Sequence, residues 1–439
     1  MTAPNTPRVG TLVSIRRLAT MFRKDFLLIF LLGALISVAQ DVFAVDNSKF
    51  SGLIKFQSAL NAYDNKSYYN RFGDSPQEQH NLDARLMYQQ QRGEWDWQVH
   101  YQVALKKTKL PPDNFSNLSA SSDADKHRLW NLTRKIKPSN RVDNIHRIDR
   151  LYLRYSVDQW VAKIGRQAIS WGHGQFFNPL DIANPFDPVL IDKEYKSGDD
   201  MAYLQWLQQN GNDLQIAVIP RRDDNGMVQS EQSTFAVKYR GLWRDLDYDL
   251  LTGRHYGENI VGFGANIPWH DSNINSDWLV SKLNPDSDRP WALIANIGIS
   301  YSWTWWNKNI FGRAEFLHNG FGIAGSPMDA AQIDTNTELL KRLLRGELYT
   351  LAKNYLATGL NIELHPLLTL DINTFINLHD PSALLQILGQ YNQSDNSNIS
   401  AGLISYIGAD GSEYGGIEIL PSQYYSRQYS LFAKYTYYF

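Results

Sequence analysis

The closing residues of the chain, YSLFAKYTYYF, alternate between apolar and polar side chains. Counted back by twos from Phe439, the apolar or aromatic positions are Tyr437, Tyr435, Ala433, Leu431 and Tyr429. Because successive side chains of a strand point to opposite faces, the segment predicts a strand with one apolar and one polar face. In a transmembrane β-barrel, lipid covers the apolar face and the polar face lines the lumen. The closing strand of a soluble sandwich is the alternative.

The same alternation recurs through the chain in segments that are individually weak. Near the start, Ile54, Phe56 and Leu60 alternate with Lys55 and Gln57. A barrel wall requires many strands that share this two-residue period. Strands are predicted at 54–62, 81–89, 95–105, 149–156, 159–169, 200–208, 213–220, 233–240, 245–253, 291–303, 309–318, 350–363, 367–378, 384–391, 398–407 and 428–439.

These sixteen segments predict an all-β fold, a transmembrane antiparallel β-barrel. The segment 259–266 would be a seventeenth strand, but single-chain bacterial barrels have an even number of strands. We therefore expect sixteen strands and keep fourteen and eighteen as alternatives. Long extracellular loops are then expected at 64–79, 107–145, 170–199, 221–232, 254–290, 319–349 and 408–427.

The tryptophans support this order of turns and loops. In the sixteen-strand arrangement, eight of them lie at the periplasmic rim, where the aromatic girdle of a membrane barrel belongs. They are Trp95, Trp97, Trp160, Trp206, Trp243, Trp303, Trp305 and Trp306.

Residues 1–44 have the order of a secretory signal peptide. Basic residues up to Lys24 precede the apolar run FLLIFLLGALISVA and the small-residue cleavage sequence VFA, which ends at Ala44. Met21 is a second candidate start, because the sequence from there is a complete signal of ordinary size. The mature protein is then a single domain, 45–439, in the outer membrane of a Gram-negative bacterium.

Composition narrows the class further. Residues 45–439 carry 38 Lys and Arg against 43 Asp and Glu, a net charge of −5 that gives no nucleic-acid footprint. The chain has no cysteine, so it has no disulfide framework and no thiolate metal site. A mean hydropathy of −0.40 with 24 Tyr and 13 Trp suits half-polar strands with aromatic rims. No cofactor or metal is expected, because His173 and the acidic residues 187–200 lack ligand spacing.

The most charged predicted hairpin is 147–167. Arg150 and Arg154 share one face of its first strand, and Lys163 faces the same way on the next strand. They predict a basic wall inside the lumen, while Arg166 lies near the following loop with its direction open. The alternative is that these cations pair with lumenal carboxylates and simply solvate the interior.

The loop that follows, 170–200, differs from the others. It is rich in Gly, Pro and aromatic residues, and Phe176 and Phe177 are too apolar for a loop in free water. We expect it to fold into the lumen, where its acidic end would face the basic wall and create a transverse field. A lid or partner surface at the barrel mouth is the alternative. The expected pore-lining and constriction residues are Arg150, Arg154, Lys163, Arg166, His173, Asp187, Asp192, Glu194, Arg313 and Glu315.

The run IGRQAISWGHGQFFNPLDIANPFDP, continuing to IDKEYKSGDDMAYLQW, resembles a signature of Gram-negative outer-membrane porin-like barrels with a GRQ-x-I-x-WG motif. The stretches AEFLHNGFG, KNYLATGL and NLHDPSALLQ are similar to the same family, so the resemblance covers most of the mature chain. The family is largely uncharacterised. The resemblance implies an outer-membrane barrel with a channel or export role, and it identifies neither a solute nor a catalytic residue.

We therefore expect a porin-type channel for passive passage of small polar or charged solutes, selected by a basic wall that faces an acidic inward loop. A gated export or anchoring barrel for a surface polysaccharide is the alternative, because Trp171 and Phe177 could stack on sugars. An enzyme is disfavoured, since no G-x-S-x-G or H-E-x-x-H is present. The expected partners are outer-membrane lipid and lipopolysaccharide, the barrel-assembly machinery acting on Phe439, a small polar solute or oligosaccharide, and a second copy in a homo-oligomer, with no nucleic acid.

Overall fold

A computed structural model describes residues 48–108, 125–136, 142–285 and 287–439. The predicted signal peptide, with Met21 and its cleavage sequence, lies outside these residues. Much of the predicted loop 107–145 also lies outside them.

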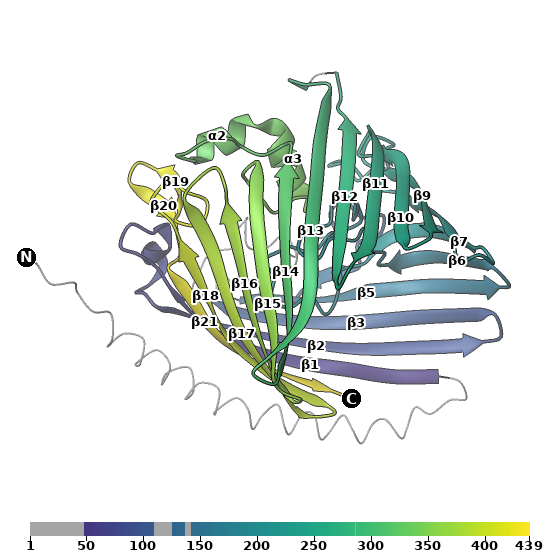
Figure 1. The fold of residues 1–439 in the computed structure, drawn as a ribbon, viewed down its shortest axis with the longest axis horizontal. Coiled ribbons are helices and arrows are strands. Elements are labelled where there is room, and N and C mark those ends of the chain that lie inside the picture. Colours follow the sequence, from purple (N-terminus) through teal and green to yellow (C-terminus); the bar gives the residue numbers. More distant parts are fainter. Residues whose placement is uncertain (1–47, 109–124, 137–141, 286) are drawn as a thin grey trace, which may run out of the picture.

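In the described part of the chain, eighteen antiparallel strands make the barrel wall (Figure 1). They are β1 (Ser48–Ala62), β2 (Gln77–Arg92), β3 (Trp95–Thr108), β5 (Val142–Val157), β6 (Trp160–Gln167), β7 (Asp199–Leu207), β8 (Asp213–Ile219), β9 (Thr234–Trp243), β10 (Leu246–His255), β11 (Glu258–Trp269), β12 (Ser272–Lys282), β13 (Trp291–Trp305), β14 (Lys308–Asn319), β15 (Asn354–His365), β16 (Leu368–Asn377), β17 (Ser382–Ser394), β18 (Ser397–Ile407) and β21 (Tyr429–Tyr438).

Short helices and strands lie at the end of the barrel that carries the long loops. In Figure 1 the two α-helices and the small hairpin sit together above the wall. No helix within the described ranges has the length and apolar content of a membrane span. The short elements are β4 (Thr133–Lys135), which pairs with β5, the hairpin of β19 (Ile417–Leu420) and β20 (Gln423–Tyr425), the 3-10 helix η2 (Tyr68–Phe72), α2 (Ala330–Thr335) and α3 (Thr337–Arg345).

The barrel closes between the first and last strands. β1 pairs with β2 on one side and with β21 on the other, in a register that runs from Leu53 opposite Tyr438 to Ala62 opposite Tyr429. Phe439 extends the pairing, because its N–H donates to the Gly52 carbonyl at 3.0 Å and its carbonyl accepts from the Gly52 N–H at 2.8 Å. Among the described residues, closure leaves the barrel wall without an unpaired edge strand, which a backbone in lipid requires. The closing role predicted for the last strand is confirmed.

The prediction of sixteen strands is wrong by one hairpin. β11 and β12 occupy residues inside 254–290, which the sequence pattern predicts to be a single extracellular loop. Their alternation is weak because the inward face of β11 carries Gly262 and Gly264, and Pro268 precedes the turn. A Cβ on Gly262 would lie 2.5 Å from a methyl of Leu180, so these glycines admit a loop that packs against the inner wall. Since two strands are added together, every later turn keeps its predicted side.

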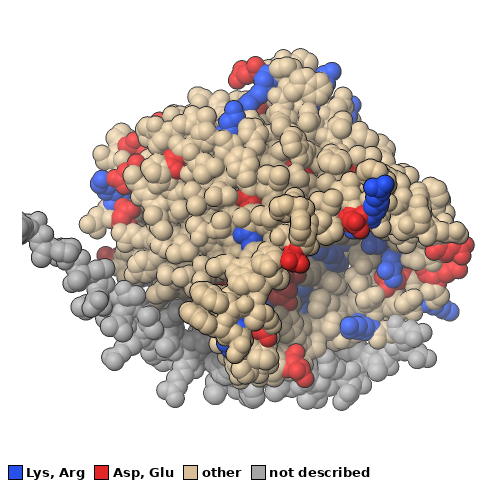
Figure 2. All heavy atoms as spheres, viewed as in Figure 1, with Lys and Arg blue, Asp and Glu red and all other residues tan. Residues whose placement is uncertain are grey.

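The outer surface of the wall is apolar and the strand ends on one side are aromatic. Ile164 and Val261 are about 60% exposed on the outer face, and Figure 2 shows one face of the molecule on which uncharged side chains predominate. Trp95 and Trp160 begin β3 and β6, and Trp305 ends β13, so they lie beside the short turns as predicted. We call this side the short-turn end and the opposite side the long-loop end. An apolar belt with an aromatic rim is the surface of a barrel set in lipid.

A charge on the outer face of β11 should destabilise the barrel in lipid. Phe263 is 42% exposed near the middle of this strand, so Phe263→Arg places a guanidinium in the apolar belt. We expect the free energy of unfolding from lipid vesicles to fall by about 2–4 kcal/mol, with Phe263→Leu as the control. Equal stabilities of the two variants would contradict the assignment of 258–269 to the wall.

Candidate functional site

The inward loop, residues 168–198 between β6 and β7, lies inside the barrel, as its apolar composition predicts. The Phe176 ring packs edge-on against Phe375 of β16, with centroids 5.4 Å apart. On another part of the wall, Leu180 contacts the inner face of β11 at Gly262. On β17, the Gln386 side chain donates to the Val189 carbonyl at 2.5 Å. The loop therefore contacts several widely separated strands.

Two carboxylates of the wall hold the first part of this loop. Asp277 on β12 accepts hydrogen bonds from the backbone N–H groups of His173 and Gly174, at 2.8 and 2.9 Å. Glu315 on β14 accepts from the N–H groups of Gln175 and Phe177, at 2.8 and 2.7 Å. A backbone outside strands and helices must find such partners when it is buried, and charged acceptors make the bonds strong. These four bonds fix the loop to the β12–β14 side of the lumen.

A second anchor holds the returning part of the loop against β2 and β5. The Tyr195 ring lies between two guanidinium groups, with Arg85 at 3.2 Å and Arg150 at 4.7 Å from its centroid. Its hydroxyl donates to Asp149 at 3.3 Å and also contacts His100. The loop is therefore attached to both halves of the wall.

Apolar side chains of the loop fill one half of the lumen. Phe176 and Phe177 belong to a buried cluster with residues of β13 to β17, and Trp171, Leu180 and Ile182 belong to another with residues of β7 to β12. Packing of this kind leaves only a small cavity of about 80 Å³ among the described residues of that side, lined by Phe177, Ile182 and Leu279. Open space is therefore displaced toward the opposite wall.

Two large cavities lie along that opposite wall. One, of about 820 Å³, opens among the long loops and is lined by β1, β2, β3 and β5 and by the loop segment around residues 184–197. The other, of about 800 Å³, lies at the short-turn end and is lined by loop residues 191–194, β17, β18 and β21. The two linings share Asp192 of the loop and Lys434 of β21. These two side chains mark the junction between the cavities.

Opposite charges meet at this junction. Lys55 of β1 forms ion pairs with Asp192 at 2.9 Å and with Glu194 at 2.6 Å, and Lys434 approaches Asp192 at 3.3 Å. The two lysines come from adjacent strands, since Gln57 of β1 is opposite Lys434 in the register. At the junction between the cavities, the loop thus presents carboxylates and the wall presents ammonium groups.

Five of the predicted pore-lining residues are Asp187, Asp192 and Glu194 of the inward loop and Arg313 and Glu315 of β14. Asp192 and Glu194 stand at the junction, and Asp187 lines the larger cavity. Glu315 is occupied by the loop backbone, and Arg313 lies over the Phe176 ring at 4.3 Å and donates to Asn373 at 3.1 Å. The structure therefore brings Asp187, Asp192 and Glu194 to the cavities and places Arg313 and Glu315 beneath the loop.

Arg166 meets the acidic end of the predicted loop 170–200 at Asp200, which lies in β7, while the other cations of the predicted basic wall have different neighbours. Arg166 is fully buried, with Asp200 at 2.8 Å and Asp125 at 3.0 Å, and Arg150 donates to the carbonyls of Asp149 and Lys196. Arg166 therefore pairs with carboxylates, as the alternative expects, whereas Arg150 donates to backbone carbonyls. Three predicted pore-lining residues remain. Arg154 lies 3.8 Å from Asp96, and Lys163 lies near the rings of Tyr152 and Tyr203. His173 lies 3.4 Å from Asp249.

The cations that pair with Asp192 and Glu194 are Lys55 and Lys434, which the sequence pattern does not single out. Both stand at polar positions of alternating strands, so the pattern places them in the lumen. The sequence does not reveal that these lysines contact the loop, because Lys55 and Asp192 are 137 positions apart. Arg85, Arg147 and Asp83 on the wall of the larger cavity are likewise not selected.

Burial shifts the pKa of several ionisable groups of the loop, among them Asp187 and Lys193. It raises the pKa of the Asp187 carboxyl to about 6, although the Val189 N–H and Lys193 favour the charged form. It lowers the pKa of the Lys193 ammonium to about 8, although Asp187 opposes the shift. Asp187 therefore changes its charge near pH 6, while Lys193 stays charged at that pH.

Comparison with protein-family models finds no match, and comparison with curated proteins finds none either. Solved structures are similar in fold. A BenF-like porin from Pseudomonas fluorescens Pf-5 has a TM-score of 0.52 and 10% sequence identity, over 90% of this chain and 99% of that chain. OccK5 (OpdH) of Pseudomonas aeruginosa has a TM-score of 0.52 and 11% identity, over 90% and 98%.

A third similar structure is Wzi of Escherichia coli, described as an outer-membrane protein involved in group 1 capsule assembly and as a carbohydrate-binding β-barrel. Its TM-score is 0.50 at 8% identity, over 93% of this chain and 87% of that chain. At such identities the likeness shows the fold alone. The fold of this protein is that of outer-membrane porins and related barrels.

Removing the charge of Glu315 should loosen the inward loop. In Glu315→Gln the N–H groups of Gln175 and Phe177 lose charge-assisted bonds worth about 1.5–3 kcal/mol each. We expect hydrogen exchange at these two amides to accelerate about tenfold or more, as measured by mass spectrometry on the folded barrel. Glu231→Gln, on an exposed loop, is the control, and equal exchange in both variants would contradict the anchoring role.

Proposed function

We propose that this protein is a porin-type channel of a Gram-negative outer membrane that passes small polar or charged solutes passively. The observation that carries the proposal is that two large cavities share Asp192 and Lys434 in their linings. One cavity reaches the long loops and the other reaches the short turns, so together they follow one side of the barrel from end to end. The shared fold with a structure described as a BenF-like porin supports the same conclusion.

Charge at the junction would provide the selection. A solute that crosses it passes between Asp192 and Glu194 on the loop and Lys55 and Lys434 on the wall. Such a transverse field orients dipolar solutes and discriminates among ions. The basic side of the pathway at this point is made by the first and last strands.

The membrane partners follow from the same proposal. Lipid and lipopolysaccharide would surround the apolar belt, and the barrel-assembly machinery would recognise the C-terminal strand with Phe439. Association into a homo-oligomer is part of the proposal, as are the cleaved signal peptide and the single mature domain. The proposed activity is transport, with no enzymatic step.

Export or anchoring of a surface polysaccharide is the second candidate. The observation that favours it is the ion pairing at the junction, where Lys55 and Lys434 join the wall to Asp192 of the loop. The likeness to Wzi, a carbohydrate-binding barrel by its description, points the same way. A gated barrel of this kind would be silent until the loop moves.

Conductance in a planar bilayer separates these candidates. Steady ohmic channels from the purified mature protein would support a porin. A silent protein that conducts after deletion of residues 172–198 would support gated export. A barrel that folds and stays closed even after the deletion would contradict both channel functions.

Charge variants at the junction should shift ion selectivity in opposite directions. Lys55→Gln with Lys434→Gln leaves the loop carboxylates unpaired, so the reversal potential in a salt gradient should move toward cation preference. Asp192→Asn with Glu194→Gln should move it toward anion preference. Lys282→Gln, at the exposed end of β12, serves as the control. A junction that does not border the pathway would leave all three reversal potentials at the wild-type value.

The pKa of Asp187 predicts a dependence on pH. Its carboxylate is charged above about pH 6 and neutral below, so the larger cavity loses a negative charge as the pH falls. We expect preference for anions to increase between about pH 7.5 and about pH 5. Asp187→Asn should show the low-pH preference throughout this range. A full wild-type pH response in Asp187→Asn would show that another group titrates.

A further inference from the structure

Three neighbouring strands present a row of polar side chains on the wall of the larger cavity. Arg85 of β2 is directly opposite Gln102 of β3, which is directly opposite Arg147 of β5. Asp83 lies two positions from Arg85 on β2, on the same face of the strand. All four side chains line the cavity.

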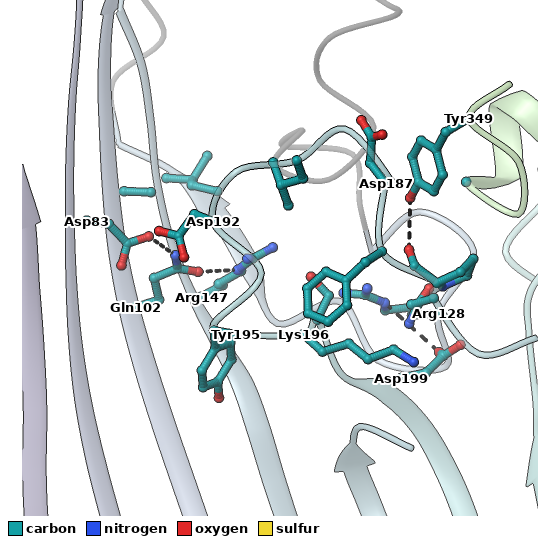
Figure 3. A pocket seen from close by; sticks show the side chains of 18 of the residues that line it. Asp83, Gln102, Arg128, Arg147, Asp187, Asp192, Tyr195, Lys196, Asp199 and Tyr349 are labelled. Atoms are coloured by element: carbon teal, nitrogen blue, oxygen red, sulfur yellow. Dashed lines mark hydrogen bonds and ion pairs between the residues drawn. The ribbon is translucent and has the colours of Figure 1, made fainter. Parts of the chain in front are cut away.

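Gln102 holds this row together. Its side-chain carbonyl accepts from Arg147 Nε at 2.6 Å, and its amide donates to Asp83 Oδ2 (Figure 3). Arg85 forms an ion pair with Asp149 at 3.0 Å and packs against the Tyr195 ring. The positions of both guanidinium groups are therefore set before any solute arrives.

Several polar atoms of the row are buried without a partner. Arg85 and Arg147 are 4% and 6% exposed. Within the described residues, Nε and Nη1 of Arg85, Nη1 of Arg147 and Oδ1 of Asp83 have no hydrogen-bond partner. Buried polar groups are almost always satisfied, so atoms of this kind beside a cavity indicate a missing partner. The vacant positions comprise donors on two guanidinium groups and one carboxylate acceptor.

The chemistry of the missing partner follows from these vacancies. Guanidinium donors select the oxygens of an anionic group, which they bind in a fork geometry. A vacant carboxylate oxygen repels an anion unless the same solute also supplies a hydrogen-bond donor. A plain acid satisfies the first requirement, and a neutral polyol satisfies the second.

We propose that Arg85, Arg147 and Asp83 form a binding site for a small hydroxylated acid, with its carboxylate on the two arginines and a hydroxyl donating to Asp83. The site deepens the proposed channel function and rests on it for the solute's route. In the register of β1 and β2, Lys55 lies opposite Asp83, so the site is next to the junction. A bound acid would be held in the larger cavity, beside the junction with the second cavity.

Three six-carbon probes test the chemistry on the full mature barrel in detergent. Gluconate carries a carboxylate and hydroxyls, sorbitol carries hydroxyls without an acid, and hexanoate carries an acid without hydroxyls. By isothermal titration calorimetry, we expect gluconate to bind at least about tenfold more tightly than either of the others. Equal affinity for gluconate and sorbitol, or for gluconate and hexanoate, would overturn the proposal.

Variants connect the binding to the named residues. Arg147→Gln should weaken gluconate binding about tenfold or more. Arg147→Lys should also weaken it, because an ammonium group lacks the forked donors with which the guanidinium binds Gln102 and the solute together. Asp83→Asn should narrow the difference between gluconate and hexanoate, an effect that a purely structural role would not produce. Arg92→Gln, exposed at the short-turn end of β2, is the matched control. Unchanged gluconate affinity in both Arg147 variants would overturn the site.

Bilayer conductance separates failure of the site from failure of the channel. Conducting channels whose current is insensitive to gluconate, together with no calorimetric binding, would overturn the site and leave the channel standing. Gluconate binding that depends on Arg147, in a barrel that does not conduct, would support the site and contradict the porin function. If Arg147→Gln does not fold, the Arg147→Lys variant and the three probes on the wild type decide.

Discussion

The pathway depends on one constraint: a buried loop must find hydrogen-bond partners for a backbone that belongs to no strand or helix. Asp277 and Glu315 supply them on one side of the lumen. Once the loop is fixed there, its apolar side chains fill that side, and the large cavities lie along β1, β2 and β21. The course of the proposed pathway is therefore decided by where the loop finds its acceptors.

Much of the fold follows from the two-residue period of the strands. The alternation identifies most of the wall, the closing strand and the side of each turn, because these are local properties of the sequence. The composition of 170–200 is equally informative, since apolar aromatics such as Phe176 have no stable place in a solvated loop. Asp192 and Glu194 were accessible to sequence reasoning for the same reason: they belong to that loop.

The rest depends on contacts between distant parts of the chain. The hairpin of β11 and β12 is hard to recognise because the inner face of β11 carries Gly262 and Gly264 in place of bulky side chains. These glycines leave room for Leu180 of the loop. Lys55 and Lys434 have unremarkable surroundings in the sequence, and they gain their importance when barrel closure sets them side by side opposite Asp192. Arg150 shows the converse, since it looks free in the pattern and is engaged by the loop in the fold.

Whether Lys434 borders the route of ions tests the account most directly. The chain has no cysteine, so Lys434→Cys introduces a single reactive position. In a planar bilayer, a negatively charged methanethiosulfonate reagent is predicted to reduce the current through Lys434→Cys. The same reagent should leave Ser281→Cys unchanged, because Ser281 is buried on β12 beneath the inward loop. An effect at Ser281→Cys with none at Lys434→Cys would contradict the proposed pathway.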